Sequence, residues 1–208
     1  MSKAAIIDYG MGNIDSVKRA VEFCGGDAFI TSSEKDISEA SHIILPGVGA
    51  FPDAIKIIKI KCLDKILKKE VFIKKKFFLG LCLGMQLMAT KGYEVEKTVG
   101  LGWFDAEVTK LVPQNNTERI PHVGWNEVLP TKESVLFKDI HVPKDFYFVH
   151  SFHVKCKNEE DILAITPYCK SFASVINKDN IFGAQFHPEK SQKVGLQFLR
   201  NFLELSDA

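Results

Sequence analysis

Short, almost continuous apolar runs alternate with longer amphipathic stretches through the first 92 residues. The apolar runs at residues 3–8, 27–31, 42–49 and 74–81 are predicted to be strands buried on both faces. Helical spacing of apolar residues appears over 14–24, 53–70 and 84–92, and a glycine pair at 25–26 ends the first of these stretches. This alternation predicts an α/β fold, with a mostly parallel open sheet and helices on both faces.

The second half of the chain has a different pattern. From Gly100 to about Val154 the apolar segments are short, aromatic and typical of β-strands. Residues 174–186 are predicted to form two strands joined by a polar turn, and residues 191–205 an amphipathic helix. Because there is no linker, repeat or low-complexity segment, we expect one domain over residues 1–208, an α/β sheet with a β-rich second half.

Composition excludes several classes of function. The net charge of +1 gives no support for a nucleic-acid or membrane-surface partner. The five cysteines are odd in number and contain no C-x-x-C pair, which argues against a disulfide framework or a structural zinc site. The sequence contains no recognisable signal peptide or membrane-spanning run, so we expect a protein of the reducing cytoplasm.

The segment GLCLG, residues 80–84, has the form of a nucleophile elbow between a strand and a helix. Glycines at 80 and 84 are expected where a tight turn leaves no room for side chains. The turn would force Cys82 outward, and the N-terminus of the following helix would favour its thiolate. A buried structural cysteine would give a similar pattern, so the motif alone leaves both interpretations open.

A cysteine nucleophile needs a base and a group that orients the base. Among the six histidines, His187 directly follows a predicted strand, and Glu189 comes two residues later. In extended chain these two side chains point to the same side, so Glu189 could hold one ring nitrogen. The alternative is a histidine at the edge of the core beside a surface acid. His150 and His153 would face opposite sides of a strand, which makes them a poor metal pair, and we expect no metal.

The segment LPGVGAF after the third predicted strand is a second special turn. Gly47, Val48 and Gly49 could direct backbone N–H groups towards a developing oxyanion. An ordinary strand-to-helix turn is the simpler interpretation. The position favours a site, because ligands of open α/β sheets bind at the carboxyl ends of the strands.

Taken together and in order, seven segments resemble the class I, triad-type glutamine amidotransferases, and within that family the HisH-type glutaminase subunits of imidazole glycerol phosphate synthase. The segments are DYGMGN, LPGVGAF, GLCLGMQL, GLGWF, IPHVGWN, YFVHSFH and GAQFHPEKSQ. The resemblance implies the class I glutamine amidotransferase fold and hydrolysis of glutamine to glutamate and ammonia through a cysteine thioester. No cofactor is implied.

The resemblance also implies roles for individual residues. Cys82 attacks the side-chain amide, His187 transfers the proton, Glu189 orients His187, and the oxyanion is held by the amide of Leu83 and one from the Gly47–Gly49 turn. The implied substrate-binding residues are Gln86, Glu94, His150, Ser151 and Phe152, the last three through their backbone. The family commonly has tyrosine where this chain has Phe152. As plain sequence, Glu94 could equally be an exposed loop acid.

The chain contains no synthase segment, so the resemblance implies a separate partner that receives the ammonia, a HisF-type (β/α)8-barrel cyclase, in a heterodimer. Asn13, Trp125, Tyr147 and Lys190 match interface positions of the family. As plain sequence, Trp125 would more often be a core residue and Lys190 a solvated one. Because the Gly47–Gly49 turn is implied to reorient when the partner binds, we expect low glutaminase activity from the chain alone.

Other functions remain compatible with parts of the pattern. A HisH-like paralogue that supplies ammonia for an acetamidino sugar in surface-polysaccharide synthesis would carry the same motifs. Peptidase- or deglycase-like α/β proteins also use cysteine elbows, but they would lack the His-Pro-Glu and IPHVGWN segments. A regulatory protein that only binds glutamine would not need Cys82 for its activity.

Overall fold

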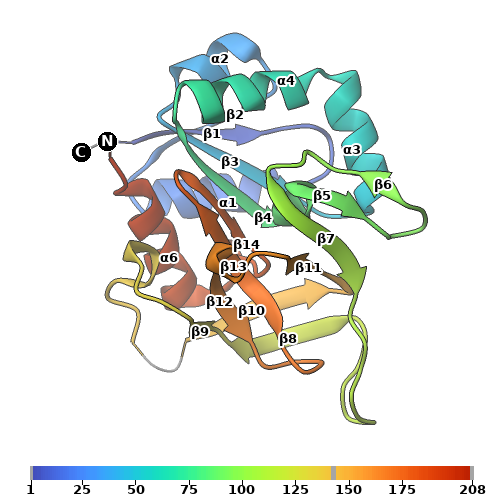
Figure 1. Cartoon of the computed structure of the whole chain (residues 1–208). Helices are drawn as coiled ribbons and strands as arrows, with labels where there is room; N and C mark the ends of the chain where they lie inside the picture. The colour runs from blue at the N-terminus through green and yellow to red at the C-terminus, as the bar shows by residue number, and fades with distance from the viewer. Residues whose placement is uncertain (1, 142–143, 207–208) are drawn as a thin grey trace.

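An eight-stranded mixed sheet runs through the computed structural model, which describes residues 2–141 and 144–206 (Figure 1). Its strands lie in the order β2 (Asp27–Thr31), β1 (Lys3–Ile7), β3 (His42–Gly47), β4 (Phe77–Cys82), β14 (Ile181–Ala184), β13 (Phe172–Lys178), β12 (Ile162–Thr166) and β9 (Leu129–Pro130). Neighbours are parallel from β2 to β14 and antiparallel beyond. The sheet therefore joins strands from both halves of the chain.

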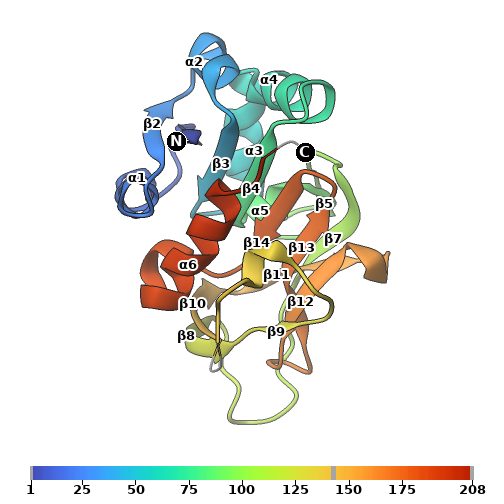
Figure 2. The same ribbon diagram turned by 90° about the vertical axis from the view of Figure 1, so that its left-hand side faces the viewer.

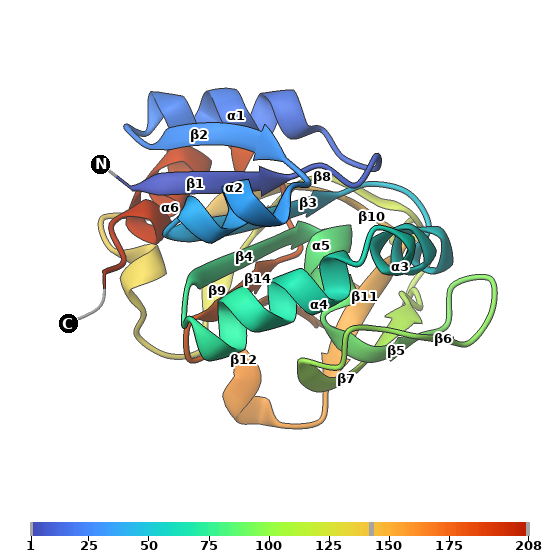
Figure 3. The same cartoon turned by 90° about the horizontal axis from the view of Figure 1, so that it is seen from above.

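Helices cover both faces of the parallel part, as Figures 2 and 3 show. One face carries α1 (Ile14–Phe23) and α6 (Gln192–Leu203); the other carries α2 (Glu34–Glu39), α3 (Phe51–Ile60), α4 (Leu63–Lys68) and α5 (Leu83–Leu87). Strand β1 shows the reason, because Ala4 and Ile6 pack into one core while Ala5 and Ile7 pack into the other. Among the described residues, no helix has the length and apolarity needed to cross a bilayer. The predicted α/β fold class is confirmed.

The β-rich second half is also confirmed. Two smaller sheets lie beside the main one, β11 (Phe152–Cys156), β7 (Phe104–Lys110), β5 (Ala89–Gly92) and β6 (Thr98–Val99) in one, and β10 (Asp145–His150) with β8 (His122–Glu127) in the other. Short 3₁₀ turns lie at Val135–Phe137, Glu159–Asp161 and Pro188–Lys190. The chain passes from β10 to β11 through Ser151 alone, so residues 150–152 link these two sheets.

The helix predicted over 53–70 is broken. Helix α3 ends at Ile60 and α4 begins at Leu63, because Cys62 takes a left-handed conformation with φ of 55°. A π-helical turn, Lys69–Ile73, follows α4. The apolar stripe continues across the break, so the periodicity of the sequence contains no sign of it.

The helix predicted over 84–92 is mostly wrong. Helix α5 ends at Leu87, and Ala89–Gly92 form strand β5 instead. Strand β5 pairs with both β6 and β7, and the amide of Leu101 bonds to the carbonyl of Leu87. These partners lie later in the chain, so local helical spacing could not reveal them.

The fold brings four strand ends together. Gly47 at the end of β3 is the register partner of Cys82 at the end of β4, and Ala184 of β14 pairs with Leu81. Tyr9 follows β1, the other neighbour of β3. Everything that comes directly after these strands is therefore gathered at one edge of the sheet, where sites of open α/β sheets form.

Candidate active site

Cys82 stands at a strained turn between β4 and α5. Its φ of 53° and ψ of −109° lie outside the regions that most L-residues adopt, which typically costs about 1–3 kcal/mol. Glycines make the turn possible: a Cβ at Gly84 would strike the carbonyl oxygen of Leu45, and one at Gly80 would lie 2.6 Å from the carbonyl oxygen of Gly84. The collision that the sequence predicts at both glycines is confirmed, and the elbow is fixed by its backbone.

His187 and Glu189 form a buried pair. The ring Nδ1 of His187 lies 2.8 Å from Oε1 of Glu189, and both side chains are almost completely buried. Burial lowers the pKa of His187, but its interactions with Cys82 and Glu189 outweigh burial and raise the pKa to about 10. The raised pKa favours a protonated imidazolium ring at neutral pH. The second ring nitrogen, Nε2, accepts or donates no hydrogen bond within the described residues.

A cavity of about 410 Å³ opens over Cys82. Its lining contains most of the residues that sequence analysis assigned to the site; it comprises Val48, Gly49, Cys82, Leu83, Gln86, Glu94, Pro121, Val149, His150, Ser151, Phe152 and His187. Gly47 and Glu189 lie just behind this lining. A cavity of this size accommodates a small molecule of a few polar groups.

Glu94 and Gln86 both line this cavity. Oε2 of Glu94 accepts a hydrogen bond from the amide of Phe51, the first residue of α3, at 2.8 Å. The side-chain amide of Gln86 donates to the carbonyl of Phe152 at 2.9 Å. Both side chains are thus fixed by backbone groups, and Glu94 retains its other carboxylate oxygen, and Gln86 its side-chain oxygen, for contact with a ligand.

The segment 150–152 also lines the cavity. His150 is buried, and burial lowers its pKa to about 3, so the ring is neutral. Its Nδ1 donates to the carbonyl of Phe152 at 2.8 Å, and its Nε2 accepts from Nδ1 of His122 at 3.0 Å. His150 therefore shapes the backbone that lines the cavity and does not carry a charge into it.

The Gly47–Gly49 turn is held by weaker contacts than the other parts of the site. The amide of Val48 donates to the carbonyl of Met11 at a long 3.4 Å, and the side chain of Val48 is 44% exposed. Gly49 has φ of 110°, and a Cβ there would meet the flexible end of Met11. In this conformation the Val48 amide is committed to Met11.

The four predicted interface residues lie outside the cavity. Trp125 is 48% exposed and forms an edge contact with Tyr147, its register partner on β10; Lys190 lies over the ring of Tyr147 at 5.8 Å. The alternative of a core position for Trp125 is therefore wrong. The backbone joins this surface to the site, because the amide of His187 bonds to the carbonyl of Tyr147. Asn13 precedes α1 without capping it by its side chain.

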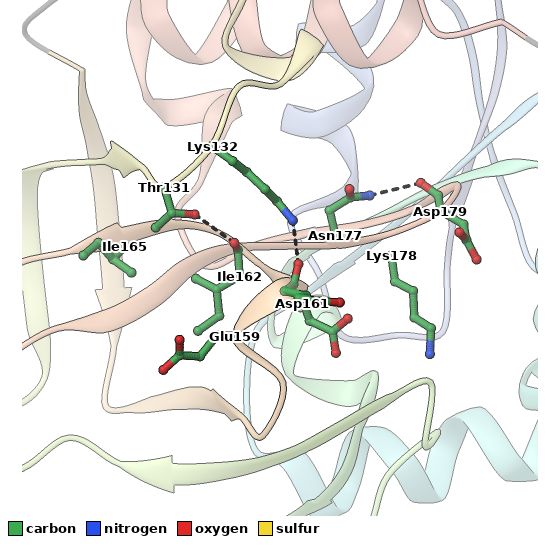
Figure 4. Close-up of a pocket in the computed structure, with 10 residues that line it drawn as sticks. Thr131, Lys132, Glu159, Asp161, Ile162, Ile165, Asn177, Lys178 and Asp179 are labelled. Atoms are coloured by element: carbon green, nitrogen blue, oxygen red, sulfur yellow. Dashed lines mark hydrogen bonds between the residues drawn. The ribbon is translucent and has the colours of Figure 1, made fainter.

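A larger hollow of about 900 Å³ lies elsewhere, and Figure 4 shows it. It is formed around β12 and β13, and the hydrogen bonds drawn there run from Thr131, Lys132 and Asn177 to backbone carbonyls. None of its lining residues belongs to the Cys82 cavity. Within residues 2–141 and 144–206, no cluster of three or more His, Cys, Asp or Glu side chains could hold a metal ion.

Sequence analysis missed four residues at this site. Pro121 and Val149 line the cavity, Gln185 contacts the sulfur of Cys82, and Tyr9 lies beneath Gly47. Gln185 stands two residues before His187, but Pro188–Lys190 form a 3₁₀ turn, so positions 185, 187 and 189 do not share one side of an extended segment. The other three fall within the segments IPHVGWN, YFVHSFH and DYGMGN, but no local pattern distinguishes any of the four.

The family description glutamine amidotransferase class-I matches residues 5–205 of this chain. Curated relatives match nearly end to end. The imidazole glycerol phosphate synthase subunit HisH 2 of Nitrobacter winogradskyi is 44% identical over 98% of this chain and 99% of its own length. The subunit HisH of Caldanaerobacter subterraneus is 47% identical over 96% of this chain and 97% of its own length.

Solved structures agree in fold at much lower sequence identity. A structure described as glutamine amidotransferase superimposes with a TM-score of 0.72 at 17% identity, covering 96% of this chain and 97% of that one. The structure of PurLQS from Thermotoga maritima gives a TM-score of 0.70 at 15% identity, covering 97% and 96%.

Proposed function

Because this chain belongs to the class-I glutamine amidotransferase family, we propose that it is the glutamine-hydrolysing subunit of an imidazole glycerol phosphate synthase in histidine biosynthesis. The observation that supports this most strongly is the cavity over Cys82, which His187 lines and where Glu189 pairs with the His187 ring. The chain acts as one glutamine amidotransferase domain over residues 1–208, in the cytoplasm and without a cofactor.

The chemistry begins with the sulfur of Cys82 attacking the carbonyl carbon of the glutamine side chain. His187 holds the proton that the thiol gives up, as the raised pKa of its ring favours. The C–N bond breaks as His187 passes this proton to the leaving nitrogen, which departs as ammonia. Water then attacks the thioester, with His187 accepting its proton, and releases glutamate and the thiol.

The remaining groups bind and orient the substrate. The amide of Leu83 and one from the Gly47–Gly49 turn stabilise the oxyanion. Glu94 pairs with the α-ammonium group of glutamine by charge, while Gln86 offers its free oxygen as a hydrogen-bond acceptor. The backbone of residues 150–152 holds the α-carboxylate, a role that does not require the tyrosine hydroxyl absent at Phe152.

The partner is a HisF-type (β/α)8-barrel cyclase, bound as a heterodimer. Ammonia in neutral water is mostly ammonium, which is not a nucleophile, so the product must pass directly to the second active site. Asn13, Trp125, Tyr147 and Lys190 form the contact surface. The bond from the His187 amide to the Tyr147 carbonyl gives this surface a direct connection to the triad.

Glutamate release from glutamine, measured with and without the partner, tests the proposed chemistry. Cys82→Ser should lower the rate by at least about 1,000-fold, because the hydroxyl is a far weaker nucleophile without the thiolate. Cys62→Ser is the matched control, since Cys62 is exposed and lies outside the cavity, and it should leave the rate unchanged. An active Cys82→Ser variant would refute the mechanism.

Complementation tests the pathway separately. The chain, expressed with its own HisF-type partner, should restore growth of a bacterium that lacks this glutaminase on medium without histidine. Glutaminase activity in vitro combined with failure to restore growth would point to the acetamidino-sugar pathway instead.

A further inference from the structure

Gln185 lies directly after β14, at the strand end next to Cys82, and its side chain is fully buried. We propose that Gln185 positions the nucleophile: its side-chain amide donates a hydrogen bond to the sulfur of Cys82 and holds the sulfur in line with His187 and the substrate. This proposal rests on the proposed function, since it concerns the same sulfur. It adds a residue that the triad and the substrate-binding groups do not include.

The direction of this hydrogen bond follows from its neighbours. The carbonyl of Phe152 can only accept, so the Gln86 atom at 2.9 Å from it must be the donor nitrogen. The same nitrogen lies 3.0 Å from the amide of Gln185, which must therefore present its oxygen to Gln86. The nitrogen of Gln185 is left facing the sulfur of Cys82 at 3.6 Å, a hydrogen-bond distance for the larger sulfur atom.

The carbonyl of Phe152 is also part of a hydrogen-bond network that continues through His150 and His122 to Asn126. His150 donates to the carbonyl of Phe152, and because its ring is neutral its other nitrogen accepts from His122. Asn126 in turn donates to His122, whose pKa burial lowers to about 4. The carbonyl of Phe152 thus accepts from both His150 and Gln86. Because it can only accept, it keeps the nitrogen of the Gln86 amide, and through it the oxygen of the Gln185 amide, in the orientation described.

A donor at this position does something that the rest of the site cannot. The titratable groups that face the sulfur are the imidazolium of His187, with Glu189 behind it, and the hydroxyl of Tyr9, whose pKa is raised by burial and by Cys82. His187 gives its proton to the departing nitrogen and later takes one from the attacking water, so its own interaction with the sulfur is not kept throughout the reaction. The side-chain amide of Gln185 exchanges no proton in these steps, so its hydrogen bond to the sulfur can persist through each of them.

The link to Gln86 connects the nucleophile with the substrate-binding wall. Gln86 uses its nitrogen for two protein acceptors, Phe152 and Gln185, and retains its oxygen for the substrate. A ligand that moved Gln86 would also turn Gln185 and displace the donor from the sulfur. Through the hydrogen bond between Gln86 and Gln185, the reactivity of Cys82 therefore depends on the orientation of the Gln86 side chain.

Alkylation of Cys82 by iodoacetamide across a pH series tests this role, with the modified peptide quantified by mass spectrometry. Gln185→Met fills similar space without a donor, and Gln185→Glu replaces the donor by an acceptor of negative charge. We expect the pH of half-maximal reactivity to rise by about one unit for Met, the equivalent of tenfold in ionisation, and further for Glu. The kcat for glutamine should fall at least tenfold while KM changes less than threefold.

Ser174→Ala is the matched control. Ser174 is as buried as Gln185, and its backbone carbonyl accepts a hydrogen bond from the backbone N–H of Gln185. The Ser174 hydroxyl has no hydrogen-bond partner among the described residues. This variant should keep the pH profile and kcat of the native chain. Gln185→Asn, which retains a shorter amide, should fall between the native chain and Gln185→Met.

Unchanged alkylation profiles in Gln185→Met and Gln185→Glu would overturn the proposal, even if both variants melted at lower temperature, because a purely structural role predicts that result. Should the Glu variant not fold, the Met variant decides alone. Failure of the proposed function is distinguishable, since alkylation reports on the sulfur whether or not the chain hydrolyses glutamine.

Discussion

The two turns that end β3 and β4 are neighbours in the sheet, yet they are built in opposite ways. At the end of β4 the backbone approaches so closely around Gly80 and Gly84 that a side chain at either would collide, and Cys82 takes a strained conformation between them. At the end of β3 the Gly47–Gly49 turn has an exposed valine and a single long backbone hydrogen bond from Val48 to Met11. One half of the site is rigid, and the other is free to change.

The difference shows where control of the reaction can reside. A peptide that rotates between residues 47 and 48 would move the Val48 amide from Met11 into the cavity, and would need to break only one long hydrogen bond. Rotation at the elbow would instead require α5 to separate from β3. A partner therefore needs little free energy to reorient the β3 turn and much more to reorient the elbow.

Gly84→Ala should have the largest effect, because the new methyl group would occupy the position of the Leu45 carbonyl. We expect a loss of about 3 kcal/mol in unfolding free energy and more than 100-fold in glutaminase rate, measured by urea unfolding and by glutamate release. Gly49→Ala, where only backbone strain and the end of Met11 oppose the change, should cost about 1–2 kcal/mol. Equal losses in the two variants would remove the distinction between the turns.

Val48→Pro should have the next largest effect on the rate. Proline removes the Val48 amide, which we take here as the donor that the Gly47–Gly49 turn contributes to the oxyanion, so the partner-stimulated rate should fall by about 100- to 1,000-fold. Only one long hydrogen bond is lost from the resting structure, and the unfolding free energy should therefore change by about 1 kcal/mol or less. Val48→Ala keeps the amide and serves as the control. A Val48→Pro variant with normal stimulated activity would exclude this amide as the oxyanion donor.

The rigid half could be recognised from sequence and the mobile half only in part. Glycines on either side of Cys82 are a local pattern with a direct geometric meaning. The predicted contact of His187 with Glu189 is present, although a 3₁₀ turn at Pro188–Lys190, and not extended chain, brings the two together. The commitment of the Val48 amide to Met11 depends on a loop from another strand, which no local pattern encodes.

The same limit explains the errors. Cys62 breaks a helix whose apolar stripe continues unchanged, and α5 stops at Leu87 because later strands pair with the residues that follow. Gln185 was missed although it stands two residues before His187, because an amide between a phenylalanine and an alanine has no recognisable chemistry until its partners are known. Long-range partners, rather than weak patterns, account for what sequence could not supply.

Glu189→Gln tests the rigid half by pH. The folded pKa of His187, about 10, is raised above the usual 6.5 by Cys82 and by Glu189 together. The stabilisation by these charges is therefore fully present below about pH 6.5 and is lost as the pH rises towards 10, and Glu189 supplies part of it. The native chain should exceed the variant in unfolding free energy by at least about 1.4 kcal/mol at pH 6, the value of one pKa unit. The gap should close by pH 10. A gap that is constant with pH would mean that Glu189 contributes packing and not charge.

Tyr9→Phe should have the smallest effect and offers the finest test of the comparison. The hydroxyl of Tyr9 is buried directly beneath Gly47 and has no hydrogen-bond partner in the described chain. Because an unpaired buried hydroxyl stabilises nothing, the variant should be as stable as the native chain or gain up to about 1 kcal/mol, and its partner-stimulated rate should stay within about threefold. A stable variant whose stimulated rate fell more than tenfold would show that the hydroxyl finds its partner only after the β3 turn has moved. In that case the Tyr9 hydroxyl would act in the moved state of the β3 turn, and that turn would depend on the residue after β1 as well as on the bond between Val48 and Met11.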